Sequence, residues 1–384
     1  TGSNTLKAAG GGSGNGDGIY APNNLNISGS GSLNVGGGSY GIYCTNDGAL
    51  TVSIAGALNV TGTGNAAVEG SRGISITAAS VTAGSPYYSV TSNGTVSVTA
   101  TSGDITLNRP NTDGSNVSGS KGIALTAIAG KITVTGGANS LVSTSGNITV
   151  TAGKDVAMTG SSNDGIKGAE VILTSGSGSV KVVGGSDGIY ATTSVTLSAP
   201  HGDVTVEGNS SGYAVSASGK PVDVTAGGTA SFEGPWGMET GALTIQANRV
   251  AVSGTDGSAL QSGGSNPGIT ITNPTDGSCE SVNLTANGSG KAAIQCGGGD
   301  VTIKADNMVI QGKNSANAIV CGTSQNDQTL TLTGAGYVIG ACSLYPAKES
   351  QTGISSTVAF DAATATADWT DRVNLSDATE KTIL

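Results

Sequence analysis

Residues 188–212 read GIYATTSVTLSAPHGDVTVEGNSSG, and the architecture can be predicted from this unit. It has one short apolar segment around Ile189 and two segments, 194–198 and 203–206, in which Val or Leu alternates with Thr or Ser. Alternation with a period of two residues is typical of β-strands with one buried face. The Gly- and Asn-rich residues between the segments predict turns. The unit is therefore expected to hold three short strands and three turns.

The same unit recurs along most of the chain. Gly-Ile-Tyr itself is found at 18–20, 41–43 and 188–190, and other units keep a single apolar residue in place of the isoleucine. These apolar anchors, which follow one another at intervals of about 25 residues, are Ile19, Ile42, Val68, Val90, Val117, Val142, Ile166, Ile189, Val215, Met238, Leu260, Ile294 and Ile319. A regular period in this range indicates a solenoid or another repeat array.

Two other repeat architectures can be set aside on their periods. A leucine-rich repeat would show a helical pattern between its strands, which this chain lacks, and a propeller blade needs about 40–50 residues. We therefore predict an all-β, single-stranded, right-handed parallel β-helix of about 13 coils, each of about 25 residues with three short strands. Each strand is expected to pair with the equivalent strand of the next coil, about 4.8 Å away.

The predicted solenoid covers residues 1–352 as one elongated domain. From residue 353 onward the pattern changes, because 361–367 is rich in Ala and Thr and charged residues become denser. We expect 353–384 to form an irregular final coil that caps the open strand edges. Longer intervals between anchors predict projecting loops at 108–114 and 273–279.

Composition limits the possible partners. The 384 residues carry a net charge of −10 without any basic stripe, so neither nucleic acid nor an anionic membrane surface is an expected partner. No apolar run approaches the ~20 residues of a membrane-spanning helix, and membrane insertion is not expected. We expect a monomer. Because the chain begins at Thr1, any export signal would lie upstream, and an extracellular location is inferred from the predicted fold.

Stacked coils turn equivalent positions into columns of neighbours. The position after each anchor should point outward, and the position two before it lies at a corner. Together these columns hold most of the few aromatic residues, beside acids and amides, which suits a sugar chain that stacks on rings and forms hydrogen bonds. The predicted carbohydrate-binding residues are Tyr20, Tyr43, Glu69, Tyr190, Tyr213, Trp236 and Glu239. The alternative is that such ladders stabilise the solenoid by stacking alone.

Two acidic residues in the corner column suggest a cation site. Asp164 and Asp187 fall on neighbouring coils, and Asn163 precedes the first. Two carboxylates at strand spacing repel each other unless a proton or a cation lies between them. Because oxygen ligands of this kind suit Ca²⁺, these three residues are the candidate calcium ligands. The alternative is that they are ordinary, solvated turn residues.

Candidate catalytic residues are few. His201 is the only histidine, and its Pro-His-Gly context predicts an exposed turn residue without a triad partner. Asp164 and Asp187 could supply the paired carboxylates of a glycoside hydrolase. Lys167, which lies between them in sequence, could act as the base of a polysaccharide lyase. Turn chemistry explains the same residues, so the chain favours a protein without enzymatic activity.

The five cysteines do not form a dense disulfide framework. Cys44, Cys296 and Cys321 each lie two residues after an anchor, in a column of small residues, and the last two fall on adjacent coils. Strand spacing is within disulfide range, but side chains in register seldom reach the required torsion, so buried free thiols are expected. Cys279 and Cys342 are predicted to lie on loops, either bonded or free.

Short words in the chain resemble a known group of proteins. Gly-Ile-Tyr followed by Leu-Asn-Ile or Leu-Asn-Val, at 25–27, 33–35 and 58–60, resembles bacterial surface β-helix proteins described as carbohydrate-binding. Segments such as 146–150 and 202–206 are similar to the repeats of large bacterial adhesins. The resemblance covers roughly residues 5–340. It implies an exported cell-surface protein with a polysaccharide-lyase-like fold, in a group of which some members bind calcium. No catalytic motif of that fold can be placed on this chain.

Three functions are compatible with these observations. The leading hypothesis is a non-catalytic, extracellular polysaccharide-binding or adhesin-like protein of the bacterial cell surface, whose partner is a polysaccharide or a host glycan. The first alternative is a calcium-dependent polysaccharide lyase or glycoside hydrolase working at Asp164, Lys167 and Asp187. The second alternative is a purely structural stalk.

Overall fold

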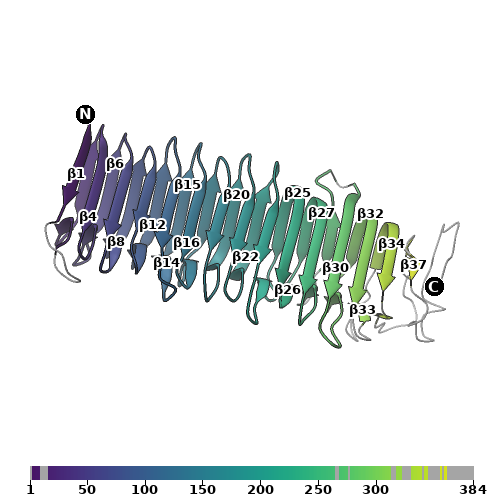
Figure 1. The fold of residues 1–384 in the computed structure, drawn as a ribbon. Coiled ribbons are helices and arrows are strands. Elements are labelled where there is room, and N and C mark those ends of the chain that lie inside the picture. Colours follow the sequence, from purple (N-terminus) through teal and green to yellow (C-terminus); the bar gives the residue numbers. More distant parts are fainter. Residues whose placement is uncertain are drawn as a thin grey trace. The chain divides into compact units, whose positions relative to one another are not determined.

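The computed structural model describes residues 2–8, 16–263, 268–275, 277–312, 317–321, 330–339, 341–344, 355–356 and 359–360. These residues form a parallel β-solenoid of about 12 turns with coils of about 25 residues, and no helix occurs among them (Figure 1). The predicted fold class is confirmed. In the part of the chain that the structure describes, there is consequently no helix of the length and apolarity needed to cross a membrane.

The chain divides into two compact units, Thr1–Ala191 and Thr192–Leu384. In the first unit every strand pairs in parallel with the equivalent strand of the next coil, which generates three strand stacks. The first stack comprises β2 (Ile19–Ala21), β5 (Ile42–Cys44), β8 (Ala66–Gly70), β11 (Tyr88–Ser92), β14 (Ser115–Gly119) and β17 (Asn139–Val142). The second comprises β3 (Leu25–Gly29), β6 (Ala49–Ile54), β9 (Gly73–Ala78), β12 (Thr95–Ala100), β15 (Gly122–Ala127) and β18 (Ile148–Ala152), and β20 (Ile166–Ser175) continues both.

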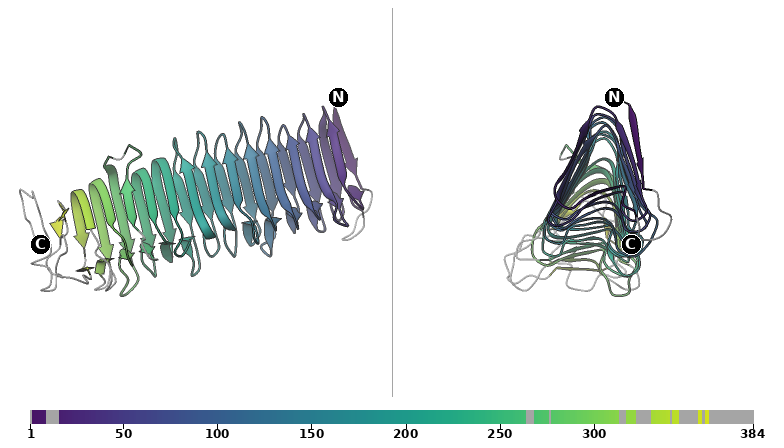
Figure 2. Two further views of the ribbon diagram at one scale, coloured as in Figure 1. Left: turned by 180° about the vertical axis from the view of Figure 1, so that it is seen from behind. Right: turned by 90° about the vertical axis from the view of Figure 1, so that its left-hand side faces the viewer.

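The third stack of the first unit completes each coil. It comprises β1 (Ser3–Lys7), β4 (Ser32–Gly37), β7 (Leu58–Gly62), β10 (Val81–Gly84), β13 (Ile105–Arg109), β16 (Ile132–Gly136), β19 (Val156–Thr159) and β21 (Val180–Val183). Seen end-on, the coils nearest the viewer, which belong to this unit, have a triangular outline (Figure 2). Three short strands per coil, as predicted from the sequence pattern, therefore form three sides.

The second unit follows the same plan with longer strands, beginning within β22 (Ile189–Ala199). Its first stack comprises β24 (Tyr213–Ser216), β26 (Trp236–Thr240), β28 (Leu260–Ser262), β31 (Ile294–Cys296), β33 (Asn317–Cys321) and β35 (Ala341–Leu344). The other sides are formed by β23 (Val204–Glu207), β25 (Val222–Gly234), β27 (Leu243–Gly254), β29 (Ile269–Thr272), β30 (Cys279–Ala286), β32 (Val301–Gly312), β34 (Leu330–Ile339), β36 (Ser355–Ser356) and β37 (Ala359–Phe360). Apart from 355–356 and 359–360, the predicted cap at 353–384 lies outside the described residues.

The core consists of like residues stacked from coil to coil. In β6, Leu50 and Val52 are buried, whereas Thr51 between them is exposed. Leu50 is in register with Ile74 of the next coil, and the same pattern repeats along the second stack. The burial of apolar area contributes roughly 25 cal/mol per Å², so each added coil stabilises its neighbours.

The register confirms the predicted anchors from Ile19 to Ile166 and from Val215 to Ile319, with one exception. Val117 pairs with Leu141 and not with Val142, and Leu141 is buried whereas Val142 is half-buried. The prediction of Val142 was wrong because two adjacent apolar side chains on a strand point to opposite sides, and only one of them can face the core. In this coil the corner residue is consequently Asn139.

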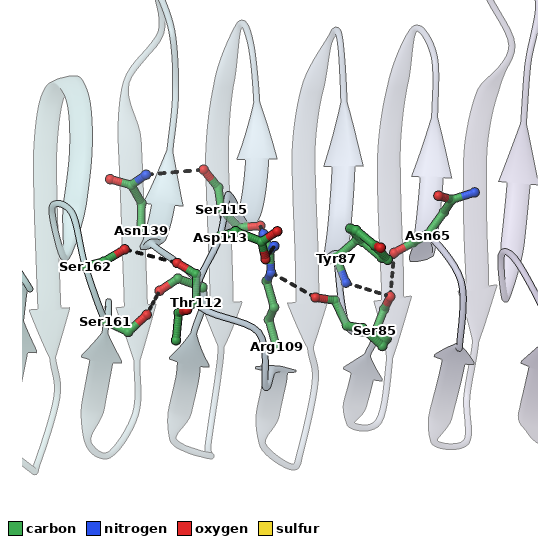
Figure 3. Close-up of polar contacts among 12 residues, drawn as sticks. Asn65, Ser85, Tyr87, Arg109, Thr112, Asp113, Ser115, Asn139, Ser161 and Ser162 are labelled. Carbon is green, nitrogen blue, oxygen red and sulfur yellow. Dashed lines mark hydrogen bonds and ion pairs between the residues drawn. The ribbon is translucent and has the colours of Figure 1, made fainter. Parts of the chain in front are cut away.

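The predicted loop at 108–114 is held against the coil by Arg109, the last residue of β13, whose side chain is only 2% exposed. Its Nε donates to the carbonyl of Pro86 at 3.1 Å and its Nη1 to the carbonyl of Ser115 at 2.9 Å. Its Nη2 lies 2.9 Å from the Asp113 carboxylate (Figure 3). The loop is therefore shorter than predicted, and a buried guanidinium ties it to its own coil and to the preceding one.

Four cysteines, Cys44, Cys279, Cys296 and Cys321, are buried free thiols. The prediction of free thiols is confirmed for the three cysteines in the column of small residues. Cys279 was placed wrongly on a loop, because it opens strand β30 and is fully buried. Cys342 also belongs to a strand, β35, by its backbone. Burial raises the pKa of the Cys279 thiol to about 11.

Candidate functional site

The outward side of the first stack carries the predicted aromatic residues of the first unit. Ile19 and Ile42 are register partners, and so are Tyr20 and Tyr43, each one position further along its strand. Because Ile42 is fully buried and neighbouring side chains alternate, the tyrosines point outward. Tyr20 is 55% exposed. The sequence prediction of outward tyrosines on adjacent coils is therefore confirmed.

Three tyrosines at this end of the unit form one group, which we call the tyrosine cluster: Tyr20, Tyr40 and Tyr43. The rings of Tyr40 and Tyr43 are stacked, with centroids 4.1 Å apart and an angle of 13° between planes. The Tyr20 ring is tilted by 54° against Tyr43 at 5.8 Å. Tyr40 is missing from the predicted binding residues, although its place in the corner column beside the same strand is the signal that could have found it.

Two carboxylates flank the tyrosine cluster. Asp17 accepts a hydrogen bond from the backbone N–H of Tyr40 at 3.3 Å. Glu69 is the register partner of Tyr43 on the next coil and is half-buried. Burial raises the pKa of the Glu69 carboxyl. Burial, together with the negative charge of Glu69, raises the pKa of Tyr40 to about 12, so the phenol stays neutral and can donate a hydrogen bond.

A second group lies further along the first unit, where Lys167 contacts both an acid and a ring. The Lys167 ammonium is 3.9 Å from the Asp164 carboxylate and 4.9 Å from the centre of the Tyr190 ring. A backbone hydrogen bond from Asp187 also reaches Asp164. Burial raises the pKa of Asp164, and the Lys167 charge and this hydrogen bond counteract part of that shift. Lys167 thus joins Asp164, which was predicted beside it as a candidate catalytic residue, to Tyr190, which was predicted separately as a carbohydrate-binding residue, and Asp187 contacts Asp164 through its backbone.

Tyr190 does not join the tyrosine cluster. Thr91, Ser118 and Val142 occupy the outward column of the coils between them, and none of these side chains is aromatic. The predicted binding residues of the first unit therefore form two separate groups and not one continuous row of rings.

The corner residues also perform a structural task. The backbone N–H of Asp164 donates to the side-chain oxygen of Asn139, one coil earlier, at 3.0 Å, and the backbone N–H of Tyr40 donates in the same way to Asp17. Corner Asp and Asn side chains thus satisfy backbone donors of the next coil. Asn163 is exposed. Among the described residues, no group of three or more His, Cys, Asp or Glu side chains is placed to hold a metal ion, and calcium at Asn163, Asp164 and Asp187 stays a prediction.

The second unit has its own aromatic group, which we call the tryptophan pair: Tyr213 and Trp236. The two are register partners on β24 and β26, with ring centroids 5.7 Å apart and planes inclined by 35°. The ammonium of Lys291 lies 4.7 Å from the centre of the Trp236 ring. Glu239, three residues after Trp236, is half-buried and in register with Gln261. Lys291 was not predicted, although it directly precedes Ala292, which holds the corner position two coils after Trp236.

A pair of carboxylates that the sequence analysis did not consider lies on another side of the second unit. Glu207 and Glu233 are register partners on adjacent coils. They line a shallow groove of about 290 Å³ together with Pro235 and Thr255. The groove is open and polar, in contrast to the largely apolar and enclosed pockets that hold small ligands in most proteins.

Comparison with known proteins identified no relative: no protein-family model, no curated protein and no solved structure matched this chain. The fold and the geometry of the two units therefore carry the functional argument.

Proposed function

We propose that this chain is a non-catalytic protein of the bacterial cell surface that binds polysaccharide on the outward side of its first strand stack. The tyrosine cluster would be the binding surface of the first unit, and the tryptophan pair that of the second. The proposed partner is a polysaccharide or a host glycan, bound by a monomer. Nucleic acid is not expected to take part, since the net charge is −10.

One observation carries the proposal: the rings on this side remain in contact with water in a chain that has few aromatic residues. Only 3% of the residues are aromatic, yet Tyr20, Tyr43 and Trp236 all lie at partly exposed positions of one stack in their units. Burying an aromatic side chain is strongly favourable, so a chain selected for stability alone would place its rings inside. Exposed rings beside hydrogen-bonding side chains suit the apolar faces and hydroxyl groups of a sugar chain.

A structural stalk makes a different prediction from the same residues. If the ring contacts served only the fold, removing a ring would lower stability without changing any binding. The 4.1 Å stacking of Tyr40 on Tyr43 contributes to stability in either case. Tyr20 separates the two hypotheses better, because a ring that is 55% exposed contributes less to the core.

The enzyme hypothesis has less support. The 3.9 Å pair of Lys167 and Asp164 brings a candidate base close to an acid, which favours it. However, the Lys167 ammonium also lies over the Tyr190 ring, and Asp164 accepts a backbone hydrogen bond. Both groups are therefore engaged by the chain itself, and a role in substrate contact or structure is favoured over proton abstraction.

A glycan array, probed with and without a chelator, tests the proposal. We expect binding of the wild-type protein, and loss of binding in Tyr43→Ala and Trp236→Ala combined. Tyr87→Ala is the matched control, because Tyr87 is an exposed tyrosine on a turn outside the strand columns. Signal at background for every glycan, or equal binding by the combined variant, would refute the proposal. Release of unsaturated or reducing-end products would favour the enzyme instead, and loss of binding with chelator would support calcium.

A further inference from the structure

We infer that the tyrosine cluster recognises a protonated amine, so that the glycan bound there carries free amino sugars. This inference rests on the proposed function, since it names the kind of sugar that the first unit selects. It depends on three features of the cluster: an uncompensated carboxylate, open aromatic faces and the lack of a cation from the chain.

Glu69 is the uncompensated carboxylate. It is half-buried beside Tyr43, and burial raises its pKa. Among the residues that the structure describes, no Lys or Arg forms an ion pair with it and no group donates a hydrogen bond to it. Withdrawing a carboxylate from water without a partner is unfavourable, and a cation bound beside it would offset that cost.

The neighbouring rings offer the faces that a cation prefers. An ammonium group is attracted to the face of a tyrosine ring within about 6 Å of its centre. One face of Tyr43 is covered by Tyr40, whereas Tyr20 is tilted by 54° and more than half exposed. Asp17 lies on the other side of Tyr40, so the rings stand between two acidic groups. This arrangement is complementary in charge to an amine.

Three other rings of the chain carry a cation from a Lys or Arg side chain, which the tyrosine cluster lacks. Tyr88 has the Arg109 guanidinium over its ring at 5.5 Å, and Tyr190 has the Lys167 ammonium. In the second unit, Trp236 has Lys291. Among the described residues, no Lys or Arg lies over a ring of the tyrosine cluster, and residues 9–15 contain no Lys or Arg. A ligand amine would take the place that a side chain of the chain takes elsewhere.

The same charges disfavour the other sugar classes. A uronic acid or sulfated sugar would place an anion beside Asp17 and Glu69, in a chain of net charge −10. A neutral or N-acetylated sugar could stack on the rings but would leave Glu69 without a counter-charge. The tyrosine cluster is therefore expected to favour an amine over its acetylated form by about tenfold, which is the effect of one cation–π contact or charge pair at a partly exposed site.

Calorimetric titration of the whole chain with two oligosaccharides tests the inference. The probes are a glucosamine oligomer and an N-acetylglucosamine oligomer of equal length, at about pH 6, where such an amine is protonated. We expect the glucosamine oligomer to bind about tenfold more tightly, and the difference to disappear in Glu69→Gln. This variant is expected to fold, because it removes an uncompensated charge. Tyr43→Ala should weaken the binding of both oligomers.

Asp47→Asn is the matched control. It makes the same change in net charge on the same coil as Tyr43, but Asp47 lies on the exposed turn after β5, in a left-handed conformation that Asn also adopts (φ 61°). Its preference for the amine should equal that of the wild type. Equal affinity for both oligomers, or a preference that survives in Glu69→Gln, would overturn the inference and leave the proposed function standing. Binding of no glycan in the array described above would refute both.

Discussion

Replacing Gly257 by alanine should disable the tryptophan pair without altering any residue that would contact a ligand. A Cβ atom built on Gly257 would overlap Cε3 and Cδ2 of the Trp236 ring and lie 2.9 Å from its Cγ. Carbon atoms in contact are normally about 3.5–4.0 Å apart. The ring therefore has to move by roughly 1 Å or more, since the backbone at Gly257 is held by a hydrogen bond to Pro235.

The expected magnitudes follow from the contacts that the ring would lose. Its packing on Tyr213 at 5.7 Å and the Lys291 contact at 4.7 Å are each worth about 0.5–1.5 kcal/mol. Crowding of this kind typically costs about 1–3 kcal/mol of stability. We thus expect Gly257→Ala to lower the stability of the second unit modestly and to weaken glycan binding there by about tenfold.

Three measurements on the same samples check this prediction: tryptophan fluorescence, thermal unfolding and glycan affinity. The chain has only two tryptophans, so displacement of the Trp236 ring should shift the emission spectrum visibly. Gly219→Ala is unsuitable as a control because of its positive φ, whereas Gly263→Ala introduces a Cβ with no atom within 4 Å. A Gly257→Ala protein with wild-type emission and wild-type affinity would show that the ring is not held as described.

Three further predictions concern the core and its charges. In urea unfolding, Arg109→Ala should destabilise the first unit by about 3–5 kcal/mol, because it removes a buried guanidinium. Asp113→Ala should cost at most about 1 kcal/mol, since Asp113 is 78% exposed. Equal losses of stability in the two variants would contradict the assigned roles. Glu69→Gln should raise the melting temperature at about pH 7. Burial raises the pKa of Glu69 above its ordinary 4.5, so ionisation of this carboxyl at higher pH penalises the folded state. The stability gained by Glu69→Gln should therefore vanish as the pH falls toward 4.5. A gain in melting temperature that is independent of pH would speak against the buried charge as its cause. Cys279 should resist maleimide in the native protein and react after denaturation, because its buried thiol has a pKa of about 11, and rapid native labelling would show that β30 opens.

The successes and failures of sequence interpretation on this chain have local explanations. Ile42, Val68 and Val90 could be recognised as core residues because burial alternates from residue to residue along a strand, and the sequence shows this alternation directly. The prediction of Val142 as an anchor was wrong because Leu141 beside it is equally apolar, so the alternation did not distinguish between the two residues. The prediction for Cys279 was wrong because strand β30 already begins at this residue, which the repeat pattern had assigned to the end of the loop at 273–279.

The candidate sites were predictable only in part. The pairing of Tyr20 with Tyr43 and of Tyr213 with Trp236 followed from the register, since equivalent positions become neighbours in a solenoid. The stacking of Tyr40 on Tyr43 within one coil depends on how the corner turns, and no spacing in the sequence encodes it.

The periodicity of the chain was sufficient to establish a parallel solenoid with three short strands per coil, because both signals are local: alternation along a strand and recurrence about every 25 residues. The tertiary structure determined which polar and aromatic groups compensate one another. Arg109 turns into the coil, Lys291 reaches Trp236 from two coils further along the stack, and Glu69 is left without a partner among the described residues. These outcomes depend on corner geometry and side-chain direction, which a repeat of single letters does not specify.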